Sequence, residues 1–378
     1  MTAWYCVAPF RQAYIDNTGV SACCQHPRTA TNLASWSTHP NLQKLQQQFL
    51  AGQQPSQCRG CVNSEALFGQ SLRTQSNKDY NNQIYTDTVI NFVDYRASNI
   101  CNFKCRSCDP TFSHGIAQEV SRNSELQKFY SVNQNKVEMV DTENFQWVID
   151  NLDQIDRLMF TGGEPTVMPE VKLMLDQVIK KSGDRISVLI TTNGSFESDF
   201  WYDLPGKIKN LHWTLSLDSI GPAAEIVRHG TQWAAVKHNA IWLAKNASSL
   251  MINSTVTNLS LFQLGPLLEF VQHLESISNG HNGCDHRLQV CNVPLHLNPR
   301  NLPPELLHSA QHYIQHCQSL NLLESQQNFL TGLAEELKKP MPDQQWQNFQ
   351  KINSTLDQIR GEDYNSLLVP LFDSFEKF

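Results

Sequence analysis

Three cysteines of this chain have the type and spacing to bind metal. Cys101, Cys105 and Cys108 lie within eight residues, in the segment NICNFKCRSCDP. Three thiolates can ligate three irons of a cubane iron–sulfur cluster, and because such clusters normally take four cysteines, one iron is left open to an external ligand. A zinc site with a fourth ligand elsewhere is the alternative, since zinc sites use similar spacings.

A second group of cysteines precedes the first and predicts a second metal site. Cys23 and Cys24 compete for one position in it, and the spacing of four residues after Gly19 favours Cys24. A four-cysteine zinc site fits this spacing, because a CxxC pair and two distant cysteines are common zinc ligands. The predicted ligands are Cys6, Cys24, Cys58 and Cys61.

Composition limits the classes of protein that can use these cysteines. The chain has 378 residues, of which 40% are hydrophobic and 17% charged, which is enough for two or three folded domains. Eight of the 11 cysteines fall in the first 108 residues, and in a cytoplasmic chain such clustering indicates metal or redox chemistry more often than disulfides. We expect a cytoplasmic protein, since its start does not resemble a signal peptide.

Charge and hydropathy exclude two classes of partner. The formal net charge is −7 and no run of Lys and Arg occurs, so we expect no nucleic-acid partner. No segment has the roughly 18 consecutive apolar residues that a membrane span needs, so we expect no membrane partner.

The elements that must position the cysteines alternate between strand and helix from about residue 88. Six β-branched strands separated by helices favour a parallel sheet built from right-handed crossover units, as either an open doubly wound sheet or a partial barrel. The predicted strands are residues 88–98, 157–163, 186–195, 211–219, 251–258 and 286–297. The predicted intervening helices are residues 142–152, 169–183, 197–204, 231–247 and 261–276.

The regions on either side differ in composition, and the chain divides into three parts. Residues 1–87 are polar and cysteine-rich, with helices predicted at 38–52 and 64–82, and a small module of this kind needs a metal to hold it together. Residues 88–300 carry the alternating pattern. Residues 301–378 are predicted to be mainly helical, at residues 302–320, 326–339 and 343–361.

The three-cysteine loop follows the first predicted strand, where parallel barrels place their active sites. With the loop in that position, CNFKCRSC resembles the CxxxCxxC signature of the radical S-adenosylmethionine (SAM) superfamily. The match continues downstream, because FTGGEP after the second strand resembles the GGE motif of that family. The resemblance implies that Gly162, Gly163 and Glu164 bind the amino group of SAM.

Further positions of the SAM site follow from the same resemblance. Asn193 in TTNG is a candidate for the lining of the SAM pocket. In LHWTLSLDS, Ser216 and Asp218 share the polar face of the strand, and related proteins use such residues for the ribose and carboxylate of SAM. Arg228 resembles an arginine that meets the SAM carboxylate, although a solvated charge at a helix end fits it equally.

The resemblance also implies a fold and an activity. The fold is a partial (β/α)6 barrel, with an N-terminal module and a C-terminal helical segment. The cofactors are SAM and a [4Fe–4S] cluster on the three clustered cysteines, reduced by a donor such as flavodoxin or ferredoxin. The activity is reductive cleavage of SAM to a 5′-deoxyadenosyl radical, which abstracts hydrogen from a substrate.

The N-terminal cysteines resemble the SPASM/twitch module of peptide-modifying radical SAM enzymes, in its shorter one-cluster form. This resemblance implies an auxiliary iron–sulfur cluster and a peptide or protein substrate for post-translational modification. Two alternatives stay open. One is a radical SAM enzyme acting on a small molecule or cofactor precursor, and the other is a non-catalytic zinc protein.

Overall fold

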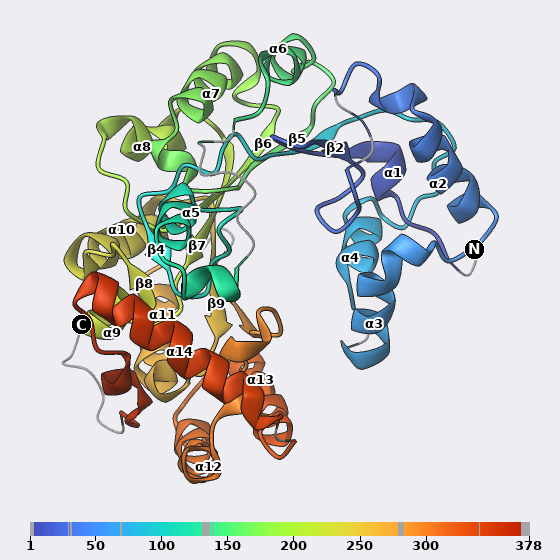
Figure 1. Cartoon of the computed structure of the whole chain (residues 1–378). Coiled ribbons are helices and arrows are strands. Elements are labelled where there is room, and N and C mark those ends of the chain that lie inside the picture. Colours follow the sequence, from blue (N-terminus) through green and yellow to red (C-terminus); the bar gives the residue numbers. More distant parts are fainter. Residues whose placement is uncertain are drawn as a thin grey trace. The chain divides into compact units, whose positions relative to one another are not determined.

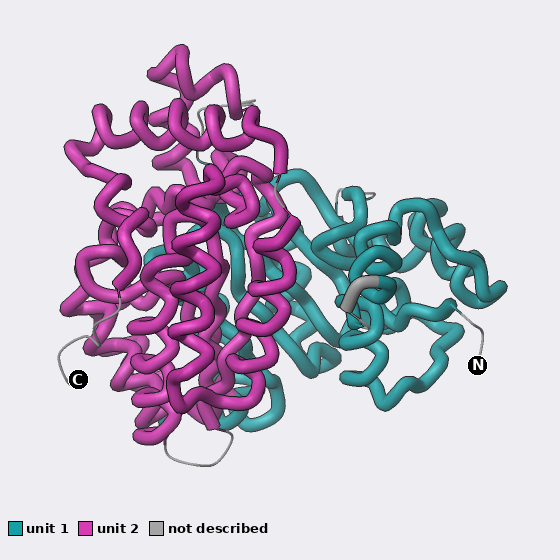
Figure 2. Tube along the Cα trace, turned by 90° about the horizontal axis from the view of Figure 1, so that it is seen from below, with its two compact units in different colours: residues 1–99, 137–190, 206–210 teal, residues 100–136, 191–205, 211–378 magenta. Residues whose placement is uncertain are grey.

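The chain forms two compact units that interleave along the sequence. The computed structural model describes residues 4–371 apart from 29, 31, 69, 131–136, 138, 279–282 and 340. Unit 1 comprises residues 1–99, 137–190 and 206–210, and the remaining residues form unit 2 (Figure 2).

Unit 1 is built on a mostly parallel sheet whose strands follow the order β6-β5-β3-β1-β2. Buried and partly exposed residues alternate along β3, β5 and β6, because successive side chains of a strand point to opposite faces. Only β2 runs antiparallel to its neighbour β1. The strands are β1 Gln12–Asp16, β2 Gly19–Ser21, β3 Phe92–Tyr95, β5 Arg157–Phe160 and β6 Ser187–Thr192.

Strands β1 and β2 have no counterpart among the predicted strands. They lie within the cysteine-rich residues 1–87, yet β1 pairs in parallel with β3, with Tyr14 opposite Asp94. The N-terminal residues therefore add two strands to the sheet of unit 1. The division of the chain at residues 87 and 300 remains a proposal.

The helices of unit 1 include a pair that was expected as one. Residues 64–82 were predicted to form a single helix, but the first of the two ends at Phe68 and the second begins at Leu72. Ser71 starts the second one, because its hydroxyl accepts from the Thr74 backbone while the Thr74 side chain caps Ser71 in return. The helices are α1 Ala8–Arg11, α2 Pro40–Leu50, α3 Arg59–Phe68, α4 Leu72–Asp79, α6 Thr142–Asp150 and α7 Pro169–Ser182 (Figure 1).

Unit 2 contains three parallel strands in the order β7-β9-β10 and a separate two-stranded ribbon, β4-β8. Along β9 every second residue is buried, as expected for a strand with one face on the core. The ribbon is antiparallel and matters for the site, because one of its strands contains Cys105. The strands are β4 Lys104–Cys105, β7 Asn210–Ser216, β8 Arg228–His229, β9 Ser249–Val256 and β10 Cys284–Val290.

Helices complete unit 2, and the last of them packs on the first. Ile116 and Val120 of α5 form one apolar cluster with Ile352 and Leu356 of α14. The C-terminal helix thereby lies against the helix that follows the three-cysteine loop. The helices are α5 His114–Ser121, α8 Asp199–Asp203, α9 Gly221–Val227, α10 Trp233–Asn246, α11 Leu264–Ser276, α12 Pro304–Gln318, α13 Glu324–Glu336 and α14 Asp343–Arg360.

The predicted fold class is confirmed. A mostly parallel central sheet with surrounding helices is an α/β fold of the partial-barrel type, and each of the six predicted strands overlaps an observed one. Across the described residues, no helix is both long enough and apolar enough to cross a membrane.

Candidate active site

The three-cysteine loop is anchored by the ribbon β4-β8. Lys104 and Cys105 pair with His229 and Arg228, respectively. Gly230 follows at φ +103°, and a Cβ atom there would lie 2.9 Å from the carbonyl oxygen of Asn102. Only glycine allows this close approach, so the ribbon is held tightly against the loop.

The sulfur atoms of the loop lie in a partly buried environment. Cys105 is buried, whereas Cys101 and Cys108 are partly exposed. The backbone amide of Phe103 donates to Sγ of Cys101 over 3.4 Å. Burial raises the pKa of the Cys108 thiol, and the nearby sulfurs of Cys105 and Cys101 raise it further, so the three thiols form one electrostatic group.

Arg228 lies beside these thiols and has one N–H group without a hydrogen-bond acceptor among the described residues. Its Nη1 donates to Oδ2 of Asp218 over 2.8 Å, but its buried Nε finds no acceptor among the described residues. Burial alone would lower the pKa of Arg228, yet Cys105 and Asp218 raise it above its ordinary value. A fixed positive charge with a buried, unsatisfied N–H suits a carboxylate ligand.

Both carboxylate oxygens of Asp218 form hydrogen bonds within the protein. Its Oδ1 accepts from the backbone amide of Thr255 over 2.8 Å, while Oδ2 accepts from Arg228. Both oxygens therefore have protein partners, and the arrangement orients Arg228. Ser216 lies at the end of β7, partly exposed, on the same face as His212 and Thr214.

Asn193 is also placed against the three-cysteine loop, in unit 2. Its Nδ2 donates to Oδ1 of Asn102 over 2.9 Å, and its Oδ1 accepts from the amide of Ser195 over 3.0 Å. Asn102 in turn donates to the Ser195 hydroxyl over 2.7 Å. This ring of bonds fastens the TTNG turn to the residue that follows Cys101.

The GGE motif lies in unit 1, at the end of β5. Gly162 has φ +111°, and a Cβ atom there would lie 2.9 Å from the carbonyl oxygen of Ser98, so the turn requires glycine. Gly163 donates its amide to the same oxygen over 3.1 Å. Glu164 is 1% exposed, and its Oε1 accepts from the amide and hydroxyl of Thr166 over 3.1 and 2.6 Å.

The N-terminal cysteines surround a cavity in unit 1, with one difference from the prediction. Cys23 lines the cavity, whereas Cys24 is exposed. The two residues are adjacent and just past β2, and of the two only Cys23 is among the residues that line the cavity. The cavity is lined by the thiols of Cys6, Cys23, Cys58 and Cys61.

Burial dominates the electrostatics of this cavity. It raises the pKa of Cys23 to about 12 and that of Cys58 to about 11. The thiol of Cys61 also donates to Oε1 of Gln25 over 3.7 Å. Buried thiols of this kind suit a metal that takes thiolate ligands, whether zinc or an iron–sulfur cluster.

The two sets of cysteines have the right chemistry for the iron–sulfur clusters that the resemblance implies, but their side chains are not arranged as a completed metal site. Over the described part of the chain, no three His, Cys, Asp or Glu side chains stand in an arrangement that could hold a metal ion. The loop nevertheless offers three thiols and, in Arg228, an unsatisfied donor for a carboxylate. That combination is what an amino-acid ligand on an open iron needs.

Sequence reasoning missed two groups of residues. Arg106, inside the CxxxCxxC segment, is fully buried and bonded to residues near the C-terminus, and nothing in the sequence pattern linked the two. His308 and His312 lie four residues apart on α12 with ring centroids 4.2 Å apart. The spacing HxxxH was a visible signal for the second group.

Part of the chain is similar to known proteins in sequence. Residues 95–262 match the sequence profile of the radical SAM superfamily. GTP 3′,8-cyclase of Campylobacter jejuni subsp. doylei is 28% identical over 136 residues, which cover 35% of this chain and 37% of that protein. The chain thus matches little more than a third of the length of this relative.

Solved structures resemble the chain at low identity. The enzyme anSMEcpe with bound AdoMet is 16% identical, with a TM-score of 0.41 over 62% of this chain and 60% of that one. Streptococcus suis SuiB bound to precursor peptide SuiA is 14% identical, with a TM-score of 0.39 over 67% and 59%. The match to the radical SAM superfamily, a superfamily of enzymes, rests on the sequence of residues 95–262 and not on these structures.

Proposed function

We propose that the protein is a radical SAM enzyme that reductively cleaves SAM and abstracts hydrogen from a substrate. The observation that carries the proposal is the cluster loop itself. Three thiols lie beside Arg228, whose buried Nε has no acceptor among the described residues, within a domain that matches the superfamily.

The chain's own residues have separable roles in this proposal. Cys101, Cys105 and Cys108 hold the cluster, which when bound supplies the electron that breaks the C5′–S bond of SAM. Arg228 binds the SAM carboxylate, and Asp218 orients Arg228. Gly162, Gly163 and Glu164 bind the SAM amino group, and Ser216 lies on the strand face that meets the ribose.

We also propose an auxiliary iron–sulfur cluster in the N-terminal cavity, as the twitch-like resemblance implies. Its ligands are taken from the thiols that line the cavity, so Cys23 replaces Cys24 in the predicted set. Zinc remains the alternative metal, because four thiolates suit both.

The substrate proposed is a peptide or protein side chain or α-carbon, on the strength of the cysteine-module resemblance. A small-molecule substrate is the second candidate, because the sequence relative is named GTP 3′,8-cyclase and a cyclase of that name acts on a nucleotide. An electron donor such as flavodoxin or ferredoxin completes the proposal. Eleven free cysteines suit a reducing, cytoplasmic location.

The decisive experiment is anaerobic reconstitution with iron and sulfide, followed by dithionite and SAM. We expect release of 5′-deoxyadenosine, measured by mass spectrometry, from the wild type but not from the triple variant Cys101→Ala, Cys105→Ala and Cys108→Ala. Cys24→Ala is the matched control, because Cys24 is exposed and outside both sets.

The non-catalytic alternative makes the opposite prediction. Stoichiometric zinc in the purified protein, together with no SAM cleavage after reconstitution, would contradict the proposed function. If SAM is cleaved, the substrate classes are separated by adding deuterium-labelled candidate precursor peptides or deuterium-labelled GTP to the active enzyme. Deuterium transfer from one of them into 5′-deoxyadenosine identifies the class that donates hydrogen.

A further inference from the structure

Arg106 lies between the second and third cysteines of the loop and has no exposed side-chain surface. A buried guanidinium is costly unless it is paired and its donors are satisfied. Its position inside CNFKCRSC means that whatever satisfies Arg106 also fixes the backbone between Cys105 and Cys108. The partners of this side chain therefore bear directly on the cluster loop.

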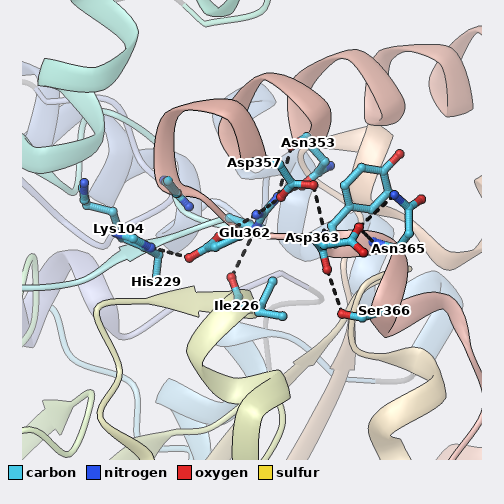
Figure 3. Close-up of polar contacts among 12 residues, drawn as sticks. Lys104, Ile226, His229, Asn353, Asp357, Glu362, Asp363, Asn365 and Ser366 are labelled. Carbon is cyan, nitrogen blue, oxygen red and sulfur yellow. Dashed lines mark hydrogen bonds and ion pairs between the residues drawn. The ribbon is translucent and has the colours of Figure 1, made fainter.

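All five N–H donors of Arg106 have acceptors. Nε donates to the carbonyl oxygen of Ile226 over 3.2 Å, and Nη1 donates to Oδ1 and to the backbone oxygen of Asn353 over 2.9 and 3.4 Å. Nη2 is ion-paired with Asp357 and, over 2.6 Å, with Glu362. Figure 3 shows Asn353 and Asp357 on α14, Glu362 just after this helix, and Ile226 on α9.

Glu362 links the loop to the ribbon. Its second oxygen bonds to Nδ1 of His229, which pairs with Lys104 in β4-β8 (Figure 3). Burial would raise the pKa of Glu362, but hydrogen bonds from His229 and Arg106 hold it below its ordinary value, so the group stays a carboxylate. One side chain of the C-terminal segment thus contacts both strand β8 and the residue that directly follows β4.

The other neighbour of Cys105 is held by the same segment. Lys104 is ion-paired with Glu119 over 2.5 Å, and Glu119 also pairs with Arg360 over 2.7 Å. Both residues that flank Cys105 are therefore connected to residues 353–362, directly or through one carboxylate. The apolar cluster between α5 and α14 lies beside these pairs.

We infer that Asn353, Asp357 and Glu362 form a loop clamp that fixes the geometry of the cluster-binding loop before metal arrives. Arg106 is the positioning residue through which the clamp acts. The inference deepens the proposed function and rests on it only for the identity of the metal group. A buried ion-pair network adds little to stability compared with apolar packing, so its role here is to specify one loop conformation.

The test uses metal-free protein, so that it is independent of SAM chemistry. In the wild type, the Arg106 amide donates to Val227 over 2.9 Å and the Cys108 amide to Cys105 over 3.1 Å, which predicts slow hydrogen exchange. The double variant Asp357→Asn, Glu362→Gln leaves Arg106 without a charged partner. We expect exchange of residues 104–109 to accelerate about tenfold or more, and alkylation of Cys105 to accelerate with it.

Glu336→Gln is the matched control, because it removes a carboxylate of α13 from another ion pair, the one that Glu336 forms with Arg300. It should leave the loop unchanged. Alkylation of buried Cys317 on α12 reports global unfolding in every variant. If hydrogen exchange of residues 104–109 is unchanged in the double variant, the clamp is overturned. It is also overturned if the alkylation rate of Cys317 rises as much as that of Cys105.

A second readout separates the clamp from the proposed function. In reconstituted protein, the double variant should lose cluster iron to a chelator faster than the wild type, with the loss followed by absorbance. If the wild type never cleaves SAM, the proposed function fails while the exchange result still decides the clamp. Retention of iron at the wild-type rate, with normal exchange, would count against the clamp alone.

Discussion

At the scale of single residues, Arg228 offers a direct test of the site. We expect Arg228→Gln to weaken SAM binding by about 10–100-fold, because a charge-assisted bond to the SAM carboxylate is worth about 1.5–3 kcal/mol. The measurement is the dissociation constant of SAM on reconstituted protein. Exposed Arg287→Gln is the control, and an unchanged constant in Arg228→Gln would remove this residue from the site.

The sequence indicated most of the residues near the cluster loop but not their relations. Asp218 and Arg228 were expected as separate SAM contacts, yet they form one pair in which both Asp218 oxygens are used. Asn193 likewise bonds to Asn102 next to Cys101. Motif spacing finds such residues, but a hydrogen bond between distant segments depends on folded geometry that spacing does not contain.

His286 predicts a pH dependence of stability. Ser254 donates its hydroxyl to the Leu217 carbonyl, so its oxygen accepts from Nε2 of His286 over 2.9 Å. Gln326 accepts from Leu323 through Oε1 and therefore points its amide nitrogen at Nδ1 over 3.0 Å. Nδ1 thus carries no proton in the folded protein.

Burial lowers the pKa of His286 from 6.5 to about 4. Between these values the unfolded chain binds the proton and the folded chain does not, so stability is lost as pH falls from 6.5 towards 4. We expect His286→Gln to lose less stability than the wild type between about pH 7.5 and about pH 5, measured by urea midpoints. Exposed His308→Gln should behave like the wild type, and equal losses in all three would refute the assignment.

At the scale of elements, long periodic segments were predictable and short ones were not. The strand and helix alternation from residue 88 was confirmed because β-branched runs and amphipathic helices have strong periodicities. Strands β1 and β2 are five and three residues long and lie in a cysteine-rich region, so their signal was too short to see. The pairing of β1 with β3 depends on a partner about 80 residues away in sequence, and β2 pairs with β1.

The end of α14 is the element on which the loop clamp depends. Gly361 has φ +68°, and its amide donates to the carbonyl oxygen of Asp357 over 2.7 Å, which ends the helix and turns Glu362 towards Arg106. We expect Gly361→Ala to cost about 1–2 kcal/mol of unfolding free energy, because only glycine adopts this conformation without strain.

Gly332 in α13 provides the matched comparison. A Cβ atom there meets nothing within 4 Å, and its φ lies outside the left-handed region. Gly332→Ala should therefore stabilise the protein by about 0.5–1 kcal/mol, since alanine favours the helix. Denaturant titrations of both variants measure the two effects, and a destabilised Gly332→Ala beside a neutral Gly361→Ala would contradict this account of the helix end.

At the scale of the whole molecule, the parts outside the alternating core are joined to it within their own units. In unit 1, residues 12–21 add two strands beside β3, and in unit 2, residues 353–362 hold the cluster loop. The N-terminal module and the C-terminal segment each contact the alternating strands and helices of their own unit. Composition alone could not show these contacts, because it does not register a strand pairing or a buried ion pair.

The metal content of the full chain is the last test, because it counts both proposed sites at once. With a [4Fe–4S] cluster in each, reconstituted protein should contain about eight irons. Cys23→Ala should reduce the iron content to about four per chain. The cluster on the three-cysteine loop should keep its spectrum and its ability to cleave SAM. Cys24→Ala should keep about eight, because its thiol lies outside the cavity that Cys6, Cys58 and Cys61 line.

The reverse result, with iron lost from Cys24→Ala and kept in Cys23→Ala, would show that the cavity changes its fourth thiol when metal binds. About four irons with one zinc in the wild type would instead identify the N-terminal site as zinc. Iron and zinc are measured together by mass spectrometry on each variant. The two cysteines are adjacent, so the pair is its own control for the loss of one thiol from this turn.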